Sequence, residues 1–142
     1  MRTIPTYAGR ALVALGLILS ASVAFGHGDV QPQPVDTTGL EPLGTEWKEA
    51  NPYRGNARAI EIGASGYGQN CARCHGLEVI SGGLAPDLRY LEKGQEGDTW
   101  FLQRVRHGAI INGMTKMPVF EGILSQEALW AIRSYLESKH ED

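Results

Sequence analysis

Apolar residues recur at helical spacing near the end of the chain, where residues 125–138 give the clearest pattern. Leu129, Ile132 and Leu136 are three or four positions apart, so they fall on one side of a helix. Ser125 stands directly before this pattern and is a residue type that caps helix N-termini through its side-chain oxygen. The pattern therefore predicts an amphipathic helix over residues 125–138, with its apolar face turned towards a core.

A second helix is predicted over residues 98–107. Phe101, Leu102 and Val105 form an apolar stripe at helical spacing. Asp98 is the expected N-cap, because its carboxylate can accept hydrogen bonds from the free N–H groups of the first turn. No stretch of the chain gives a convincing strand pattern, and the fold class is therefore predicted to be all-α.

Residues 59–70 predict a third, weaker helix. Gly63, Gly66 and Gly68 lie within it, and each glycine costs up to about 1 kcal/mol relative to alanine in a helix interior. A helix that keeps these residues needs a tertiary reason for them. We expect another helix to cross this one at close range, where a side chain would not fit.

The remaining segments predict loops. Residues 76–97 are rich in turn-forming residues. Residues 27–58 read as an extended arm, because four prolines interrupt any helix there. The predicted globular domain is then residues 59–142, built from about three main helices.

The first 26 residues have the pattern of a secretory signal peptide. A start with two arginines precedes a short apolar run over residues 11–19, and small residues follow at cleavage-site spacing. We expect cleavage after Gly26 or after Ala24, and release of a soluble protein into the periplasm. An uncleaved membrane anchor is the alternative, but the apolar run is short for a membrane span.

Net charge narrows the range of partners. The signal peptide holds two of the 13 basic residues and none of the 16 acidic ones, which leaves 11 against 16, a net charge of −5. A basic surface is the usual mark of a nucleic-acid-binding domain, and this chain has no such excess. We therefore expect no nucleic-acid partner.

Two cysteines and a histidine form the motif Cys71-Ala72-Arg73-Cys74-His75. Cys-x-x-Cys-His is the attachment sequence of a c-type haem. Thiols three positions apart on one helical turn can reach the two vinyl groups of one porphyrin and form thioethers with them. The next residue, His75, then supplies an imidazole to the iron. Covalent haem is attached outside the cytoplasm, which agrees with an export signal.

Three other interpretations of the cysteine pair fit the sequence less well. A thioredoxin-like redox pair follows a strand in a βαβ unit, whereas the residues before Cys71 are rich in glycine and polar side chains. A structural zinc site needs four ligands, and the chain holds no second cysteine pair. A disulfide between Cys71 and Cys74 would close a very small loop, in which a cross-link removes little chain entropy.

The chain resembles the class I cytochromes c. Gly63 and Tyr67 match the first helix of that family in their distance from the haem motif, and residues 124–136 resemble its last helix. Pro86-Asp87-Leu88 resembles the corner whose proline carbonyl accepts the Nδ1 proton of the proximal imidazole, which implies that Pro86 orients His75. Met117-Pro118 resembles the loop of the distal ligand, which implies Met117 as the second axial ligand of the iron.

Local chain stiffness also favours Met117 over Met114 as that ligand. Pro118 keeps the residue before it out of the helical region, so that Met117 lies in a stiff, extended segment. Met114 follows the flexible Asn112-Gly113 turn and is expected at the surface.

A narrower resemblance covers nearly all residues after the signal peptide. The start His27-Gly28-Asp29-Val30 and the segments 61–67 and 121–127 look like the soluble cytochrome c-550 family of bacterial quinoprotein alcohol oxidation. The resemblance implies a one-electron carrier that accepts electrons from a periplasmic alcohol dehydrogenase containing pyrroloquinoline quinone (PQQ). The electrons would pass on towards a terminal oxidase or another cytochrome.

Two other functions stay open at this point. The chain could be the haem subunit of a larger respiratory or dehydrogenase complex, held by an uncleaved N-terminus or by the proline-rich arm. It could instead be a haem enzyme or gas sensor with five-coordinate iron, which would require that Met117 does not bind the metal.

Overall fold

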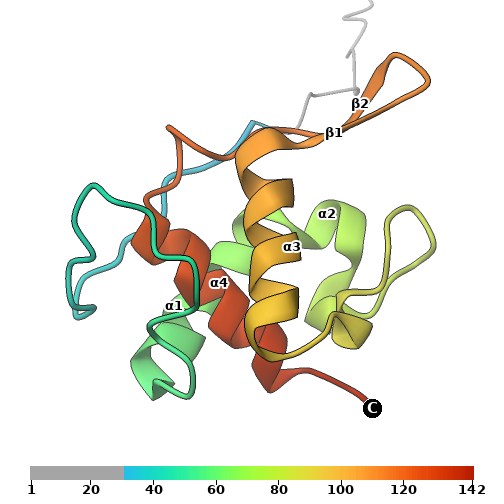
Figure 1. The fold of residues 1–142 in the computed structure, drawn as a ribbon. Coiled ribbons are helices and arrows are strands. Elements are labelled where there is room, and N and C mark those ends of the chain that lie inside the picture. The colour runs from blue at the N-terminus through green and yellow to red at the C-terminus, as the bar shows by residue number, and fades with distance from the viewer. Residues whose placement is uncertain (1–30) are drawn as a thin grey trace, which may run out of the picture.

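The structure, a computed structural model, describes residues 31–142, so the predicted signal peptide lies outside the described residues. The described part holds the helices α1 (Ala57–Asn70), α2 (Ala72–His75), α3 (Gly94–His107) and α4 (Gln126–Ser138), shown in Figure 1. Its shorter elements are the 3₁₀ turns η1 (Leu77–Val79) and η2 (Leu88–Tyr90) and the strands β1 (Ala109–Ile111) and β2 (Met114–Met117). The prediction of a small fold with about three main helices is confirmed. Between residues 31 and 142, no helix combines the length and apolar character that a membrane crossing needs.

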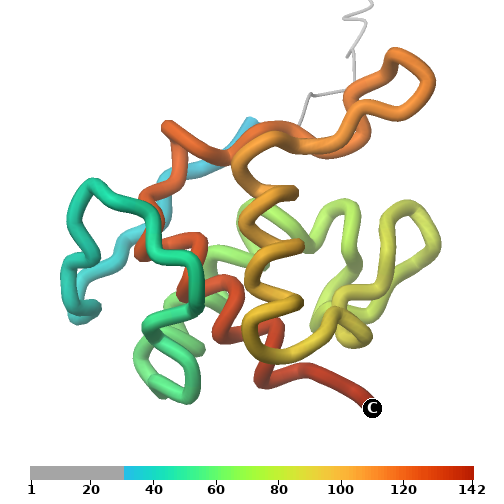
Figure 2. The backbone as a smooth tube through the Cα atoms, viewed as in Figure 1, coloured from blue at the N-terminus to red at the C-terminus, as the bar shows by residue number. Residues whose placement is uncertain are grey.

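The crossing of α1 and α4 is the centre of the core, and the two helices can be followed in Figure 2. A Cβ atom added at Gly63 would lie 2.0 Å from the carbonyl oxygen of Ala131, so α4 passes directly over this glycine. The close crossing predicted from the glycines of residues 59–70 is therefore confirmed. Most of the large side chains buried around it come from α4: Leu129, Trp130, Ile132 and Leu136.

Helix α3 begins at Gly94, and the prediction that Asp98 caps its N-terminus is wrong. Asp98 lies inside the helix and is fully buried. Its carboxylate is 2.8 Å from Nε of Arg133 and 2.6 Å from Nη2 of Arg54, and it accepts a hydrogen bond of 2.8 Å from the N–H of Asn51. A buried carboxylate is tolerated only with such partners. They come from distant parts of the chain, which local spacing does not reveal.

The hairpin β1–β2 corrects the expectation that no strand would form. The strands pair antiparallel, with Ile111 opposite Met114, around Asn112-Gly113. Both turn residues have positive φ, 51° and 75°, as a tight hairpin turn requires. The Asn112-Gly113 dipeptide predicts the turn, but strands of three and four residues are too short to show an alternating pattern.

The segment 31–56 contains no helix or strand, yet it is tied to the helices by hydrogen bonds. The N–H of Gln33 donates to Oδ1 of Asn70 at 2.6 Å, and the N–H of Leu43 donates to Oε1 of Glu127 at 2.8 Å. Tyr53 is buried in the core. This part of the predicted arm therefore packs against α1 and α4.

Candidate haem and electron-transfer site

The predicted haem-attachment residues lie at the junction of α1 and α2. Helix α1 ends at Asn70, and the N–H of the next residue, Cys71, donates to the carbonyl of Tyr67 at 2.8 Å. The N–H groups of Cys74 and His75 then both donate to the carbonyl of Cys71, at 3.1 and 3.0 Å. These bonds form one tight helical turn, which is the local structure that the spacing predicted.

The two cysteines are partly buried and are not joined by a disulfide. Burial, and then the nearby Cys74, raise the pKa of the Cys71 thiol to about 12. Zinc binding needs a group of ligands, and no cluster of three His, Cys, Asp or Glu side chains lies within residues 31–142.

His75 is buried, with 8% of its surface exposed, and its Nδ1 lies 2.9 Å from the carbonyl oxygen of Pro86. A carbonyl can only accept a hydrogen bond, so Nδ1 must carry the proton. In the neutral imidazole this leaves the lone pair on Nε2, the nitrogen that can bind a metal. The two residues that the sequence linked as ligand and orienting group are therefore in contact.

Contacts made by Gly76 and by Tyr67 fix the chain just after His75. Gly76 has φ of 86°, and a Cβ atom there would lie 1.8 Å from the carbonyl oxygen of Ile80, so only glycine fits. The hydroxyl of Tyr67 donates a hydrogen bond of 2.7 Å to the carbonyl of Gly76. Burial raises the pKa of Tyr67, so this hydroxyl keeps its proton and stays a donor. The family resemblance singled out Tyr67, but this contact was not predicted.

Met117 ends strand β2 and packs against the core, whereas Met114 at the hairpin turn is 54% exposed. The backbone comes unusually close here, since a Cβ atom at Gly108 would lie 2.5 Å from the carbonyl oxygen of Met117. Beyond the Met-Pro pair, the N–H of Phe120 donates to the carbonyl of Val105 at 2.8 Å. Both ends of the segment that carries Met117 are thus held against α3. In Figure 1 the hairpin and α2 lie on the same side of α3.

Large apolar side chains remain exposed in the two segments next to His75 and Met117. In the first segment these are Leu77, Ile80 and Leu84, and in the hairpin they are Ile110, Ile111 and Met114. Exposed apolar surface of this kind marks a binding region. Together with two thiols, an imidazole with free Nε2 and a thioether, it fits an iron porphyrin, which is a large apolar disc.

Comparison with known proteins agrees with this chemistry. The family described as "Cytochrome C oxidase, cbb3-type, subunit III" matches residues 58–136. The chain is also 62% identical over 135 residues to "Cytochrome c550" of Pseudomonas aeruginosa, covering 92% of each chain. The chain is a class I c-type cytochrome. It therefore binds haem c covalently and is an electron-transfer protein, not an enzyme.

This cytochrome is also similar to short segments of much longer proteins. It is 36% identical over 88 residues to "Quinohemoprotein alcohol dehydrogenase ADH IIB" of Pseudomonas putida. That match covers 62% of the cytochrome but 12% of the dehydrogenase. "Quinohemoprotein alcohol dehydrogenase ADH-IIG" of the same species is 36% identical over 84 residues, or 11% of its length. No solved structure matches the cytochrome.

Proposed function

We propose that this cytochrome is a periplasmic one-electron carrier, which accepts electrons from a PQQ-dependent alcohol dehydrogenase and passes them towards a terminal oxidase. Its similarity to segments of two quinohemoprotein alcohol dehydrogenases is the observation that supports this donor most strongly. A haem segment within a dehydrogenase chain implies electron transfer from the rest of the dehydrogenase to that segment. A separate cytochrome of the same kind would accept these electrons as a diffusing partner. The export pattern of residues 1–26 supports the periplasmic location.

We further propose that Cys71 and Cys74 form the two thioethers and that His75 and Met117 are the axial ligands of the iron. Pro86 would hold His75 in position through the hydrogen bond of 2.9 Å to Nδ1. Haem c supplies the one-electron exchange between ferric and ferrous iron. The residues of the chain would bind it and shield it from water, and His75 and Met117 would together leave no ligand position of the iron open for a substrate. His and Met ligation together raise the reduction potential, which suits an acceptor from a reduced quinone.

The charges near these residues would influence how a partner approaches. Arg73 and Lys116 are both exposed, one beside the cysteines and the other beside Met117. On a protein with a negative total charge, a locally positive edge would orient encounters with an acidic partner. Isolated surface charges contribute little to the affinity itself, so this effect would appear in the association rate and in its dependence on salt.

The donor is tested by mixing the oxidised cytochrome with a purified PQQ alcohol dehydrogenase and its alcohol substrate in a stopped-flow spectrophotometer. We expect full reduction of the haem at a rate that supports the turnover of the dehydrogenase and falls as salt rises. A nicotinamide-linked alcohol dehydrogenase with the same substrate is the control, and it should give no fast reduction. Equal rates with the two enzymes, or no reduction by the quinoprotein, would reject the proposed donor.

The description of the matching family, a subunit of an oxidase, favours one alternative, in which the cytochrome is the haem subunit of a larger complex. Cell fractionation separates the two functions. A diffusing carrier is expected in the periplasmic fraction with its N-terminus at His27 or Phe25. Recovery of the chain in the membrane fraction, starting at Met1, would favour the complex.

A further inference from the structure

Three charged residues hold the loop that contains Pro86. Arg89 lies 3.0 Å from Oδ1 of Asp87 through Nε and 2.8 Å from Oδ2 through Nη2. Its Nη1 is 2.7 Å from Oε1 of Glu141. Arg89 and Asp87 are largely shielded, with 18% and 20% of their side chains exposed. Two parallel N–H···O bonds between a guanidinium and a carboxylate give a rigid geometry, which a single charge contact does not. We refer to Asp87, Arg89 and Glu141 as the proximal clamp.

Asp87 connects this clamp to both sides of the loop. Its Oδ1 accepts the N–H of Arg89 at 3.1 Å and thereby caps the turn η2. Its Oδ2 accepts the N–H of Ser81 at 3.3 Å, and the hydroxyl of Ser81 donates to the carbonyl of Ala85 at 2.5 Å. The Arg89 guanidinium holds the pKa of Asp87 well below its usual range, so the carboxylate stays charged at neutral pH. Pro86 lies between Ala85 and Asp87, and both of these neighbours are thus fixed.

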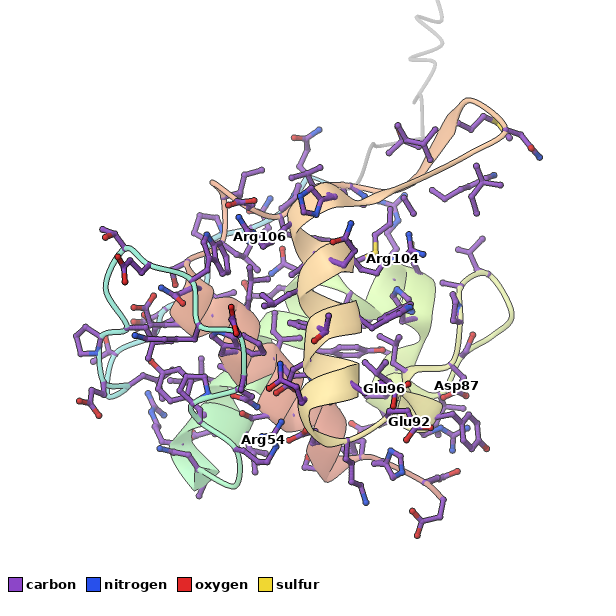
Figure 3. The ribbon with its side chains drawn as sticks, in the orientation of Figure 1. Arg54, Asp87, Glu92, Glu96, Arg104 and Arg106 are labelled. Carbon is purple, nitrogen blue, oxygen red and sulfur yellow. The ribbon has the colours of Figure 1, made fainter. Side chains whose placement is uncertain are left out.

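The C-terminal segment completes the clamp from outside. The N–H of Glu141 donates to the carbonyl of Arg89 at 3.1 Å, next to the contact between their side chains. Nδ1 of His140 lies 3.1 Å from the carbonyl oxygen of Leu91. Figure 2 shows the C-terminal segment running beside the chain at residues 88–93, and Figure 3 labels Asp87 on the loop above it. Residues 52 and 49 positions apart in the sequence therefore hold one short turn.

The loop needs this support because its own sequence is flexible. A Cβ atom added at Gly82 or at Gly83 would have no neighbouring atom within 4 Å, and Gly83 has φ of 91°. Leu84 is 77% exposed, so packing does not hold this part of the loop. Apart from the clamp, the hydrogen bond from Ser81 to Ala85 and the buried side chain of Leu88 hold this loop, and the Pro86 carbonyl itself makes one bond, to His75.

We propose that the proximal clamp positions the Pro86 carbonyl and thereby sets the strength of its hydrogen bond to Nδ1 of His75. The inference rests on the proposed function, in which His75 binds the iron. A strong hydrogen bond at Nδ1 makes an imidazole a better electron donor at its other nitrogen. The clamp residues would then tune the bond between His75 and iron without touching the haem, so Asp87, Arg89 and Glu141 are positioning residues.

The test compares Arg89→Met, Arg89→Lys and the control Arg58→Met. Arg58 is an exposed arginine whose Nη1 lies 2.8 Å from Oε2 of Glu61 on α1, so its loss removes an arginine–carboxylate pair outside the clamp. Each substitution is made in a Met117→Ala background, in which resonance Raman spectroscopy of the ferrous haem reports the iron–histidine stretching frequency. The midpoint potential is measured in parallel on the single variants.

Arg89→Met is expected to lower the iron–histidine frequency and to raise the midpoint potential, because a weaker donor stabilises ferric iron less. Arg89→Lys keeps a charge but not the two parallel bonds, so we expect a smaller shift in the same direction. Arg58→Met should leave both quantities unchanged. A frequency that does not differ between Arg89→Met and its parent would overturn the inference.

Two outcomes separate this inference from the proposed function. If no iron–histidine band appears in the Met117→Ala parent, the ligand assignment fails, whatever the clamp does. If Arg89→Met does not fold, Glu141→Ala replaces it, since Glu141 is half exposed and its backbone bond to Arg89 remains. Glu141→Ala is then expected to lower the frequency by a smaller amount, and an unchanged frequency would overturn the inference.

Discussion

Met117→Ala is expected to convert a haem whose iron has no free ligand position into one that binds carbon monoxide rapidly in the ferrous state. The substitution removes the thioether proposed as the second axial ligand and leaves the position open. The midpoint potential should fall, because methionine ligation favours ferrous iron. The absorption band of the iron–sulfur bond should vanish from the ferric spectrum. Carbon monoxide mixing and a redox titration measure these changes.

Met114→Ala is the matched control for this experiment. The residue is three positions away on the same hairpin, but its side chain is 54% exposed and follows the turn at Asn112-Gly113. We expect an unchanged iron–sulfur band and no carbon monoxide binding. Loss of the band in Met114→Ala, with Met117→Ala unaffected, would show that the other sulfur binds the iron.

Gly63→Ala is expected to destabilise the protein strongly, although alanine is the best helix-forming residue. The added Cβ atom would lie 2.0 Å from the carbonyl oxygen of Ala131 and 2.5 Å from its carbonyl carbon. Neither atom belongs to a flexible side chain, so α1 and α4 must move apart. Overpacking of this kind typically costs about 1–3 kcal/mol. Thermal unfolding of the holoprotein, followed by circular dichroism, measures the loss.

Gly68→Ala is the control, with the opposite sign. Gly68 lies on the same helix, and nothing is within 4 Å of an added Cβ atom. This substitution should raise the melting temperature, because alanine in a helix interior is favoured over glycine by up to about 1 kcal/mol. Equal melting temperatures for Gly63→Ala and the unmodified protein would mean that the two helices do not meet at this glycine.

The sequence predicted those parts of the fold that follow from local patterns. The apolar stripe of Leu129, Ile132 and Leu136 and the cap at Ser125 predicted α4 nearly to the residue. The costly glycines of residues 59–70 predicted the crossing at Gly63, because a local penalty that persists needs a tertiary cause. The start of α3 was missed, since Asp98 has the residue type of a cap but is buried between two arginines.

In the candidate site, too, local patterns predicted some residues, whereas contacts between distant residues were not predicted. Cys71, Cys74 and His75 could be named because the chemistry of attachment fixes their spacing. Pro86 came from the family resemblance, and its contact with His75 is present in the structure. The proximal clamp could not have been predicted, because Arg89 and Glu141 are 52 positions apart and no periodicity connects them. Long-range ion pairs leave no signal in a single sequence.

The claim on which the rest depends is that Cys71 and Cys74 hold one haem covalently. Mass spectrometry of the denatured holoprotein tests it, followed by peptide mapping of the segment around residues 71–75. We expect the mass of the mature chain plus one haem, with that haem retained on the peptide that contains both cysteines. Haem that is extracted into acidic organic solvent, leaving two free thiols on the peptide, would contradict the proposed site.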